Sequence, residues 1–216
     1  MSLLALLAAV AGLRLAAKLT RWQQLQRATA AAHALAPTLR EGDLIFQTSP
    51  STQSRAIQLA THSPYSHCGL LLRQPGGWQV LEAVQPVRLT PQGRWVARGR
   101  GGHFVVKRLR DADRVLTLTI ARLRVAEQPL LGRPYDLAFS WSDERLYCSE
   151  LLWKLYDRAL HRQLGTLQRL GDFDLRHPAV QAKLRERYGP HPPLDEPVIS
   201  PAAVFASPAL RVVAAR

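Results

Sequence analysis

The sequence predicts a mixed α+β domain, and three observations support this fold class. Short apolar strands and longer helical segments follow one another without the regular alternation that builds a parallel sheet. A Gly-Gly turn at 76–77 joins two apolar runs, which is typical of a β-hairpin. The leucines of 149–160 recur at helical spacing and share one face. With 216 residues, of which 47% are hydrophobic, the chain is long enough for one buried core.

The first segment, over residues 1–34, is expected to be a hydrophobic leader followed by a helix. Residues 1–17 are almost entirely Leu, Ala, Val and Gly, and Lys18 and Arg21 follow them. An apolar run of about a dozen residues is short for a membrane span, and it suits a secretory signal or an uncleaved anchor. A helix packed on the domain is the alternative. We therefore expect a cell-envelope location, either periplasmic or membrane-anchored.

The domain itself is expected over residues 35–216, with a C-terminal extension. It opens with a short strand at 44–47, and Ser49-Pro-Ser51 predicts the cap of a helix that runs to about Thr61. Three further strands are expected, and the Gly-Gly turn joins the first two into the hairpin. These strands cover 67–73, 78–84 and 87–89.

The second half of the domain is expected to be mainly helical. Thr90-Pro91 predicts a helix start, with Pro at the first helical position. A strand at 104–109 follows, and Asp111 is expected to cap a longer helix that ends before Gly132. A loop over 132–136 and the segment 143–147 lead to Cys148. After the helix at 149–160, a Pro-rich, charged tail returns as a short strand and helix over 198–205.

The net charge of +13 does not predict a nucleic-acid partner. The basic residues are nearly all Arg and are scattered, with a mild concentration over 94–110, whereas a nucleic-acid-binding domain clusters them on one element. A solvated, Arg-rich surface is the simplest interpretation. Contact with anionic lipid headgroups or acidic polymers at a membrane surface is the alternative.

Cys148 stands directly before an amphipathic helix, and this position suits a nucleophile. The unpaired N–H groups and the dipole at a helix N-terminus lower the pKa of a thiol there. The resulting thiolate can attack a carbonyl carbon, and the same N–H groups can hold the oxyanion that develops. The alternative is that Cys148 is a small buried hydrophobic residue.

His67 and Glu82 are candidate partners of Cys148. Strand alternation places His67 on the same face as Gly69, and Cys68 on the opposite face. Glu82 lies across the hairpin in an apolar run, where burying a lone carboxylate costs several kcal/mol, so antiparallel pairing beside His67 would give it a partner. A structural histidine and a solvent-facing edge glutamate are the alternatives. Cys68 is expected to point into the core, so that neither a metal pair nor a disulfide with Cys148 is expected.

We expect no metal and no cofactor. The seven histidines lack the HExxH spacing, and there is no CxxC pair. The glycines of 99–102 are not followed by the Lys-Ser/Thr of a phosphate-binding loop. Two cysteines exclude a disulfide framework.

Four segments, in this order along the chain, resemble the motifs of the bacterial YiiX/YaeF-like group. This group consists of permuted papain-like cysteine hydrolases of the NlpC/P60 superfamily, related more distantly to lecithin:retinol acyltransferase-like enzymes. The resemblance covers about residues 39–160, and it also includes the stretch 53–65 and the box 132–136. The four segments are Glu41-Gly-Asp-Leu-Ile-Phe46, Tyr65-Ser-His-Cys-Gly-Leu70, Leu81-Glu-Ala-Val84 and Tyr147-Cys-Ser-Glu-Leu151. Cys68 stands where an aliphatic residue is expected.

The resemblance implies a circularly permuted papain-like (NlpC/P60) fold, in which a small antiparallel sheet packs against the helix that bears the nucleophile. It implies that Cys148 is the nucleophile, His67 the general base and Glu82 the orienting residue. It also implies that Tyr147 and Tyr135 line the substrate site.

The sequence therefore predicts a cysteine hydrolase or acyltransferase. It would cleave an amide or ester bond through an acyl-enzyme, in a small-molecule, peptide or lipid-linked substrate, with cell-wall peptides and lipid-linked acyl groups as the two favoured classes. The alternative is a catalytically inert, membrane-associated binding module on the same fold.

Overall fold

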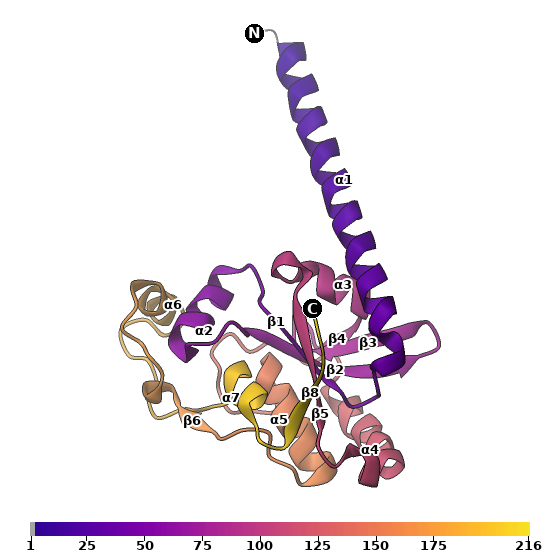
Figure 1. Ribbon diagram of the computed structural model, residues 1–216. Coiled ribbons are helices and arrows are strands. Elements are labelled where there is room, and N and C mark those ends of the chain that lie inside the picture. Colours follow the sequence, from indigo (N-terminus) through magenta and orange to yellow (C-terminus); the bar gives the residue numbers. More distant parts are fainter. Residues whose placement is uncertain (1–2) are drawn as a thin grey trace.

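The computed structural model describes residues 3–216 and has a six-stranded antiparallel sheet at its centre (Figure 1). The strand order is β4-β3-β2-β1-β5-β8, and each neighbouring pair is antiparallel. The mixed α+β prediction is confirmed. The strands of this sheet are β1 (Leu44–Gln47), β2 (His67–Gln74), β3 (Gly77–Glu82), β4 (Arg88–Pro91), β5 (Phe104–Leu109) and β8 (Leu210–Ala215).

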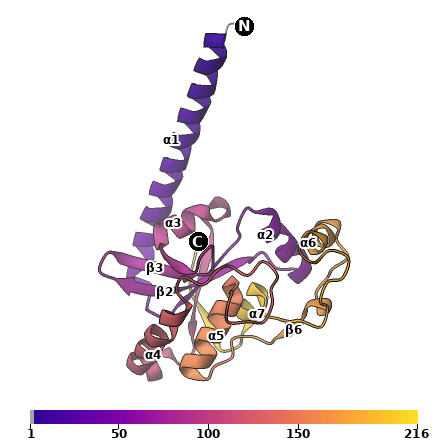
Figure 2. The ribbon, with the colours of Figure 1, turned by 180° about the vertical axis from the view of Figure 1, so that it is seen from behind.

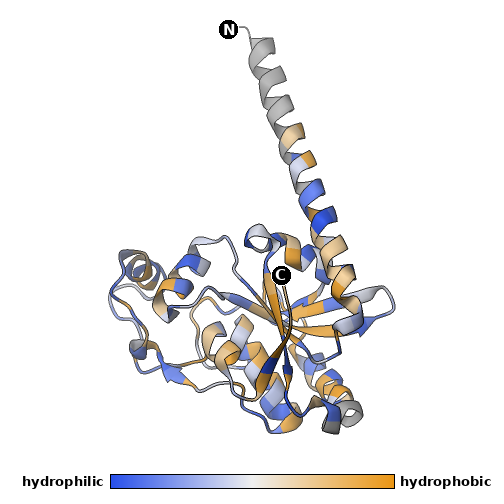
Figure 3. Ribbon diagram, in the orientation of Figure 1, coloured by the Kyte–Doolittle hydropathy of each residue, from blue (hydrophilic) through white to orange (hydrophobic). Residues whose placement is uncertain are grey.

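Helices cover both faces of the sheet and create two cores. On one face, Leu44, Phe46 and Leu70 pack against α5 (Cys148–Leu160), α4 (Ala112–Glu127) and α7 (Pro201–Ala206). On the other face, Ile45 and Leu71 pack against α3 (Gln92–Arg98) and the C-terminal part of α1 (Leu3–Leu35). Successive strand residues therefore alternate between the two cores, and Figure 3 shows hydrophobic residues concentrated on the central strands.

Most elements up to residue 160 agree with the sequence-based expectations. The strands at 44–47 and 104–109 are confirmed, and so is the hairpin of β2 and β3. The cap of α2 (Thr52–Thr61) is confirmed, because the Ser51 side chain accepts a hydrogen bond from the Ser54 N–H at 3.0 Å. The expected helix start at Thr90-Pro91 is wrong by a residue or two: both residues end β4, and Pro91 precedes α3.

The C-terminal part contains elements that the sequence did not predict. They are α6 (Pro178–Tyr188), β8 and β6 (Gln168–Arg169), which pairs with β7 (Pro197–Val198). α6 packs against α2, far from it in sequence (Figures 1 and 2). Only Val180 of α6 is fully buried, so the helix lacks a strong apolar stripe. Short 3₁₀ helices complete the fold at Ala36–Thr38, Arg100–Gly102, Gln128–Leu130 and Leu170–Asp172.

α1 extends away from the rest of the molecule (Figures 1 and 2). Its C-terminal part is anchored on α3 by buried alanines, among them Ala28 and Ala32, whereas Leu15, Leu19 and Trp22 are exposed. No helix within residues 3–216 is long and apolar enough to span a membrane. Residues 1–2 of the expected leader and the side chains of 3–14 lie outside the described part of the chain, so the leader stays a prediction.

Gly69 allows β2 and β3 to pair closely beside His67. It lies on β2 directly before Leu70, which pairs with Leu81 of β3. A Cβ atom at position 69 would lie 2.3 Å from Val80 Cγ1 and 2.8 Å from the Leu81 carbonyl oxygen. Because the second obstacle is backbone, any side chain at this position would force the two strands apart.

We therefore expect Gly69→Ala to destabilise the protein by about 1–3 kcal/mol, as overpacking in a core does. A thermal unfolding curve followed by circular dichroism would show a lower Tm, by about 2–4 °C per kcal/mol. Gly76→Ala is the matched control, because a Cβ there would meet no atom within 4 Å. Equal losses of stability in the two variants would contradict the proposed role of Gly69.

Candidate active site

Cys148, His67 and Glu82 converge at one end of the sheet. Cys148 is the first residue of α5, His67 the first of β2 and Glu82 the last of β3. His67 and Glu82 lie on the sheet face covered by α3, whereas Cys148 approaches from the face covered by α5. His67 Nε2 lies 2.7 Å from Glu82 Oε2, and His67 also hydrogen-bonds to the Cys148 thiol. Since Glu82 occupies Nε2, we assign Nδ1 as the nitrogen that faces Cys148.

Glu82 is fully buried, and both of its carboxylate oxygens have partners. Oε2 is paired with His67, while Oε1 accepts hydrogen bonds from Thr90 Oγ1 at 2.6 Å and from the Arg98 guanidinium. Burial alone would raise the pKa of Glu82, but the hydrogen bond and charge of His67, followed by Arg98 and Thr90, lower it to about 2. Glu82 is therefore ionised at neutral pH, and it is not the solvent-facing edge residue of the alternative interpretation.

His67 is positively charged at neutral pH. Burial acts to lower its pKa, but hydrogen bonds with Cys148 and Glu82, and the negative charges of both, raise the pKa of His67 to about 9. Trp95 of α3 stacks on the imidazole, with ring centroids 5.8 Å apart and planes inclined by 25°. The imidazole of His67 is therefore held in place by the Glu82 carboxylate at Nε2 and by the ring of Trp95.

The pKa of Cys148 is lowered by its neighbours. A hydrogen bond from the Cys68 thiol holds the pKa of Cys148 well below its ordinary value. Burial opposes this effect, while the hydrogen bond and charge of His67 reinforce it. The Cys68 backbone also hydrogen-bonds to the Cys148 sulfur. The lowered pKa of Cys148 and the raised pKa of His67 both favour a thiolate–imidazolium pair.

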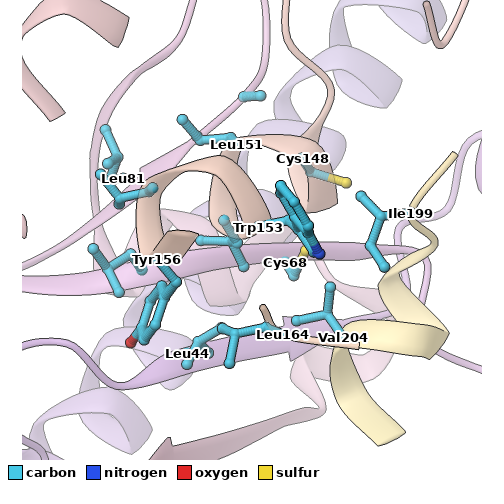
Figure 4. Packing of buried hydrophobic residues seen from close by; sticks show 14 of the residues in the cluster. Leu44, Cys68, Leu81, Cys148, Leu151, Trp153, Tyr156, Leu164, Ile199 and Val204 are labelled. Carbon is cyan, nitrogen blue, oxygen red and sulfur yellow. The ribbon is translucent and has the colours of Figure 1, made fainter. Parts of the chain in front are cut away.

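Cys68 points into the core as expected, but the sequence did not predict that it would meet Cys148 there. Strand alternation does turn Cys68 away from His67, but it turns Cys68 towards the face on which α5 lies, and α5 begins with Cys148 (Figure 4). Burial and the adjacent thiolate raise the pKa of Cys68 well above its ordinary range, so that Cys68 keeps its proton and donates it. Both cysteines are free, and no disulfide joins them.

Tyr147 and Tyr135 both lie beside these groups. Tyr147 is buried, and its hydroxyl accepts a hydrogen bond from the Ile199 N–H at 3.0 Å. The Tyr135 hydroxyl accepts one from Gln53 Nε2 at 2.8 Å. Burial, followed by the charge of Cys148, raises the pKa of Tyr135, so this hydroxyl remains protonated.

Two cavities of different character meet at this point. The first, which we call the apolar cavity, is lined by Cys148, Tyr147 and mainly apolar side chains of α2, α6 and the segment 197–201, and its volume is about 90 Å³. The second, the polar cleft, is lined by His67 and has a volume of about 390 Å³. Gln53 and Ile57 of α2 line both. The other polar residues of this cleft are Gln47, Ser49, Ser51, Ser54, Ser66, Gln85, Arg98 and Tyr135, and Ala83, Val84 and Leu137 add apolar surface to it.

Gln53, Arg98 and Cys68 are the site residues that the sequence did not single out for a role here. Arg98 is one of many arginines, and no local pattern marks it as the partner of Glu82. Gln53 is in the first turn of a predicted helix, where its direction depends on how that helix packs. Cys68 was noticed as a departure from the family pattern, and that departure was the available signal.

Comparisons with known proteins found relatives of this chain. A family model described as "Permuted papain-like amidase enzyme, YaeF/YiiX, C92 family" matches residues 38–214. The chain is 50% identical over 173 residues to the uncharacterized protein YiiX of Escherichia coli (strain K12), covering 80% of this chain and 85% of that protein. It also resembles the crystal structure of the metalloprotein yiiX from Escherichia coli O157:H7, with a TM-score of 0.79 and 49% identity. That match covers 82% of this chain and 97% of the other.

The word metalloprotein describes that relative. Within the described part of this chain, no three His, Cys, Asp or Glu side chains are arranged to hold a metal ion. His67, Glu82 and Cys148 instead satisfy one another in a proton-sharing chain. Among the described residues, these three side chains are thus partners of one another rather than ligands grouped for a metal ion.

The hydrogen bond from Cys68 leads to a prediction for the reactivity of Cys148. Removing the thiol donor in Cys68→Ala should raise the pKa of Cys148, so that alkylation by iodoacetamide at about pH 6 becomes severalfold slower. Cys68→Ser, which restores a donor, should recover part of the rate. Peptide mass spectrometry across pH would measure both. An alkylation profile in Cys68→Ala that coincides with that of the parent protein would remove Cys68 from the site.

Proposed function

The chain belongs to the permuted papain-like amidase family of YaeF and YiiX, and on that premise we propose that it is a cysteine hydrolase or acyltransferase that cleaves an amide or ester bond through an acyl-enzyme. The observation that carries the proposal is the thiolate–imidazolium pair of Cys148 and His67, backed by the buried, ionised Glu82. A catalytically inert binding module would have no use for a thiolate in a cavity.

In the first half of the reaction, the Cys148 thiolate attacks the substrate carbonyl carbon. The first N–H groups of α5, at Cys148 and Ser149, have no partner within the helix and stabilise the oxyanion that forms. The imidazolium of His67 then donates its proton to the leaving nitrogen or oxygen. The bond to the leaving group breaks, and a thioester remains on Cys148.

In the second half, a nucleophile attacks the thioester carbon and His67 takes its proton. The bond between that carbon and the Cys148 sulfur then breaks, which releases the acyl product and restores the thiolate. Glu82 keeps the imidazole oriented through Nε2 and stabilises the charged form each time it appears. Water as the nucleophile gives a hydrolase, whereas an amine or alcohol gives an acyltransferase. Every step uses side chains and backbone groups of this chain, without a cofactor.

We also propose that the enzyme acts at the cell envelope, on a cell-wall peptide or a lipid-linked substrate. The apolar leader supports this location. So do the exposed Leu15, Leu19 and Trp22, which have helical spacing on the extended α1, with the exposed Lys18 among them. Such a surface suits contact with anionic headgroups.

Cys148→Ala should abolish turnover of a model ester or amide, to below about 1 in 1,000 of the parent rate, because it removes the thiolate that attacks the carbonyl. The parent protein, quenched in acid during turnover, should carry an acyl adduct on Cys148 that intact-mass spectrometry detects. Full turnover by Cys148→Ala would refute the mechanism, whatever adducts form.

The pH profile of kcat/KM should be broad and fall above about pH 9. Below that value His67 holds the proton that the leaving group needs, and above it the proton is lost. Glu82→Gln removes the negative charge that raises the pKa of His67, so the descending limb should move to lower pH. An unmoved descending limb in Glu82→Gln would show that Glu82 does not support the imidazolium.

A further inference from the structure

The two cavities at the candidate active site differ in polarity. The apolar cavity lies on the side of Cys148, and the more polar one on the side of His67. Cys148 lines the apolar cavity but not the polar cleft, whereas His67 lines the polar cleft but not the apolar cavity. The scissile bond of a bound substrate must lie between the two reactive groups. One side of the substrate therefore meets apolar side chains, and the other meets polar ones.

The apolar cavity has few polar groups left for a ligand. Ile57, Phe139, Val180, Leu184 and Ile199 line it. Three polar side chains of its wall have partners within the protein: Thr61 donates to the Ile57 carbonyl, Ser149 to the Ile199 carbonyl, and Ser200 accepts from the Ala203 N–H. Arg187 also lines the cavity, and its guanidinium lies over the Phe139 ring, 4.5 Å from the centroid. Lys183 is paired with Glu186. A ligand in this cavity therefore gains burial of apolar surface, at about 25 cal/mol per Å².

The polar cleft is different in both size and chemistry. Its volume is larger than that of the apolar cavity, at about 390 Å³ against about 90 Å³. The side chains of Ser49, Ser51, Gln85 and Tyr135 face it, and Arg98 lies at its wall. Ser51, Gln85 and Tyr135 each accept one hydrogen bond within the protein, and their hydroxyl and amide hydrogens can be donated to a polar group in the cleft.

The chemistry of an acyl-enzyme fixes which part of the substrate lies on which side. The acyl group becomes bonded to the Cys148 sulfur, so its chain must extend from Cys148. The leaving group receives its proton from His67, so it must lie within reach of the imidazole. We infer that the substrate is an amide or ester of an apolar acyl chain with a polar amine or alcohol, the acyl chain occupying the apolar cavity and the polar leaving group the cleft beside His67.

This inference rests on the proposed function, because the acyl-enzyme mechanism decides which part of the substrate lies in which cavity. It narrows the substrate class to amides or esters of lipid-like acyl groups. A small apolar cavity, of about 90 Å³, suits an unbranched apolar chain more than a ring or a peptide. α6 supplies Val180 and Leu184 to the cavity wall. The C-terminal region therefore selects the acyl chain, while the sheet and α5 supply the reactive groups.

Two isomeric amides test the direction. The 2-hydroxyethyl amide of dodecanoic acid has its long chain on the acyl side, and N-dodecyl glycolamide has it on the amine side. The full chain should cleave the first at least about 100-fold faster than the second, since only the first places its chain in the apolar cavity. Within a series of acyl lengths, kcat/KM should rise about fourfold per methylene until the cavity is filled. Faster cleavage of N-dodecyl glycolamide that depends on Cys148 would overturn the inference and leave the enzyme intact.

A variant pair tests the cavity itself. Leu184→Gln should lower the ratio of long-chain to acetyl turnover, because it places an amide in the apolar wall. Gln181→Ala, on the exposed face of the same helix, should leave that ratio unchanged. An unchanged ratio in Leu184→Gln would exclude the apolar cavity as the acyl site.

A binding measurement separates the two proposals if neither amide is cleaved. Calorimetry with Cys148→Ala protein and the dodecanoyl amide, at concentrations below those at which the amide forms micelles, measures binding to the apolar cavity when no cleavage can occur. Saturable binding that is weakened by Leu184→Gln would support the acyl site while the proposed function fails. Absence of both cleavage and binding would overturn the inference as well.

Discussion

The ion pair between Glu82 and His67 is the interaction on which the candidate active site depends. A carboxylate as fully buried as Glu82 is costly unless its charge is compensated. His67, Thr90 and Arg98 compensate it, and in return the carboxylate keeps the imidazole charged. The charged imidazole then stabilises the thiolate of Cys148. Loss of the carboxylate would therefore lower the pKa of His67, and the weaker positive charge on the imidazole would in turn raise the pKa of Cys148.

The sheet separates these groups as well as joining them. His67 and Glu82 belong to the face under α3, and Cys148 belongs to the face under α5, so the two meet only where β2 begins. The same separation gives each reactive group its own cavity, apolar for the sulfur and polar for the imidazole. Both the contact between the reactive groups and the proposed orientation of the substrate thus arise from one geometric feature: the start of α5 lies next to the start of β2.

The local parts of this arrangement could be predicted from the sequence, and the tertiary parts could not. The cap at Ser51, the hairpin and the helix after Cys148 depend on near neighbours in the chain, and their patterns predicted them. The approach of Cys68 to Cys148 depends on which sheet face α5 covers. α6 is stabilised by its contact with α2 rather than by its own apolar pattern, and β8 by pairing with β5. No alternation or spacing in the chain contains that information.

Cys148 acquires its lowered pKa from Cys68 and His67, which β2 brings to the start of α5, and this makes its reactivity a property of the folded chain alone. In an unfolded molecule both cysteines are ordinary thiols, with pKa values near about 8.5. At mildly acidic pH an electrophile would then discriminate between native and denatured molecules by rate. A single labelling time course could count the native fraction in a mixture, without any knowledge of the natural substrate.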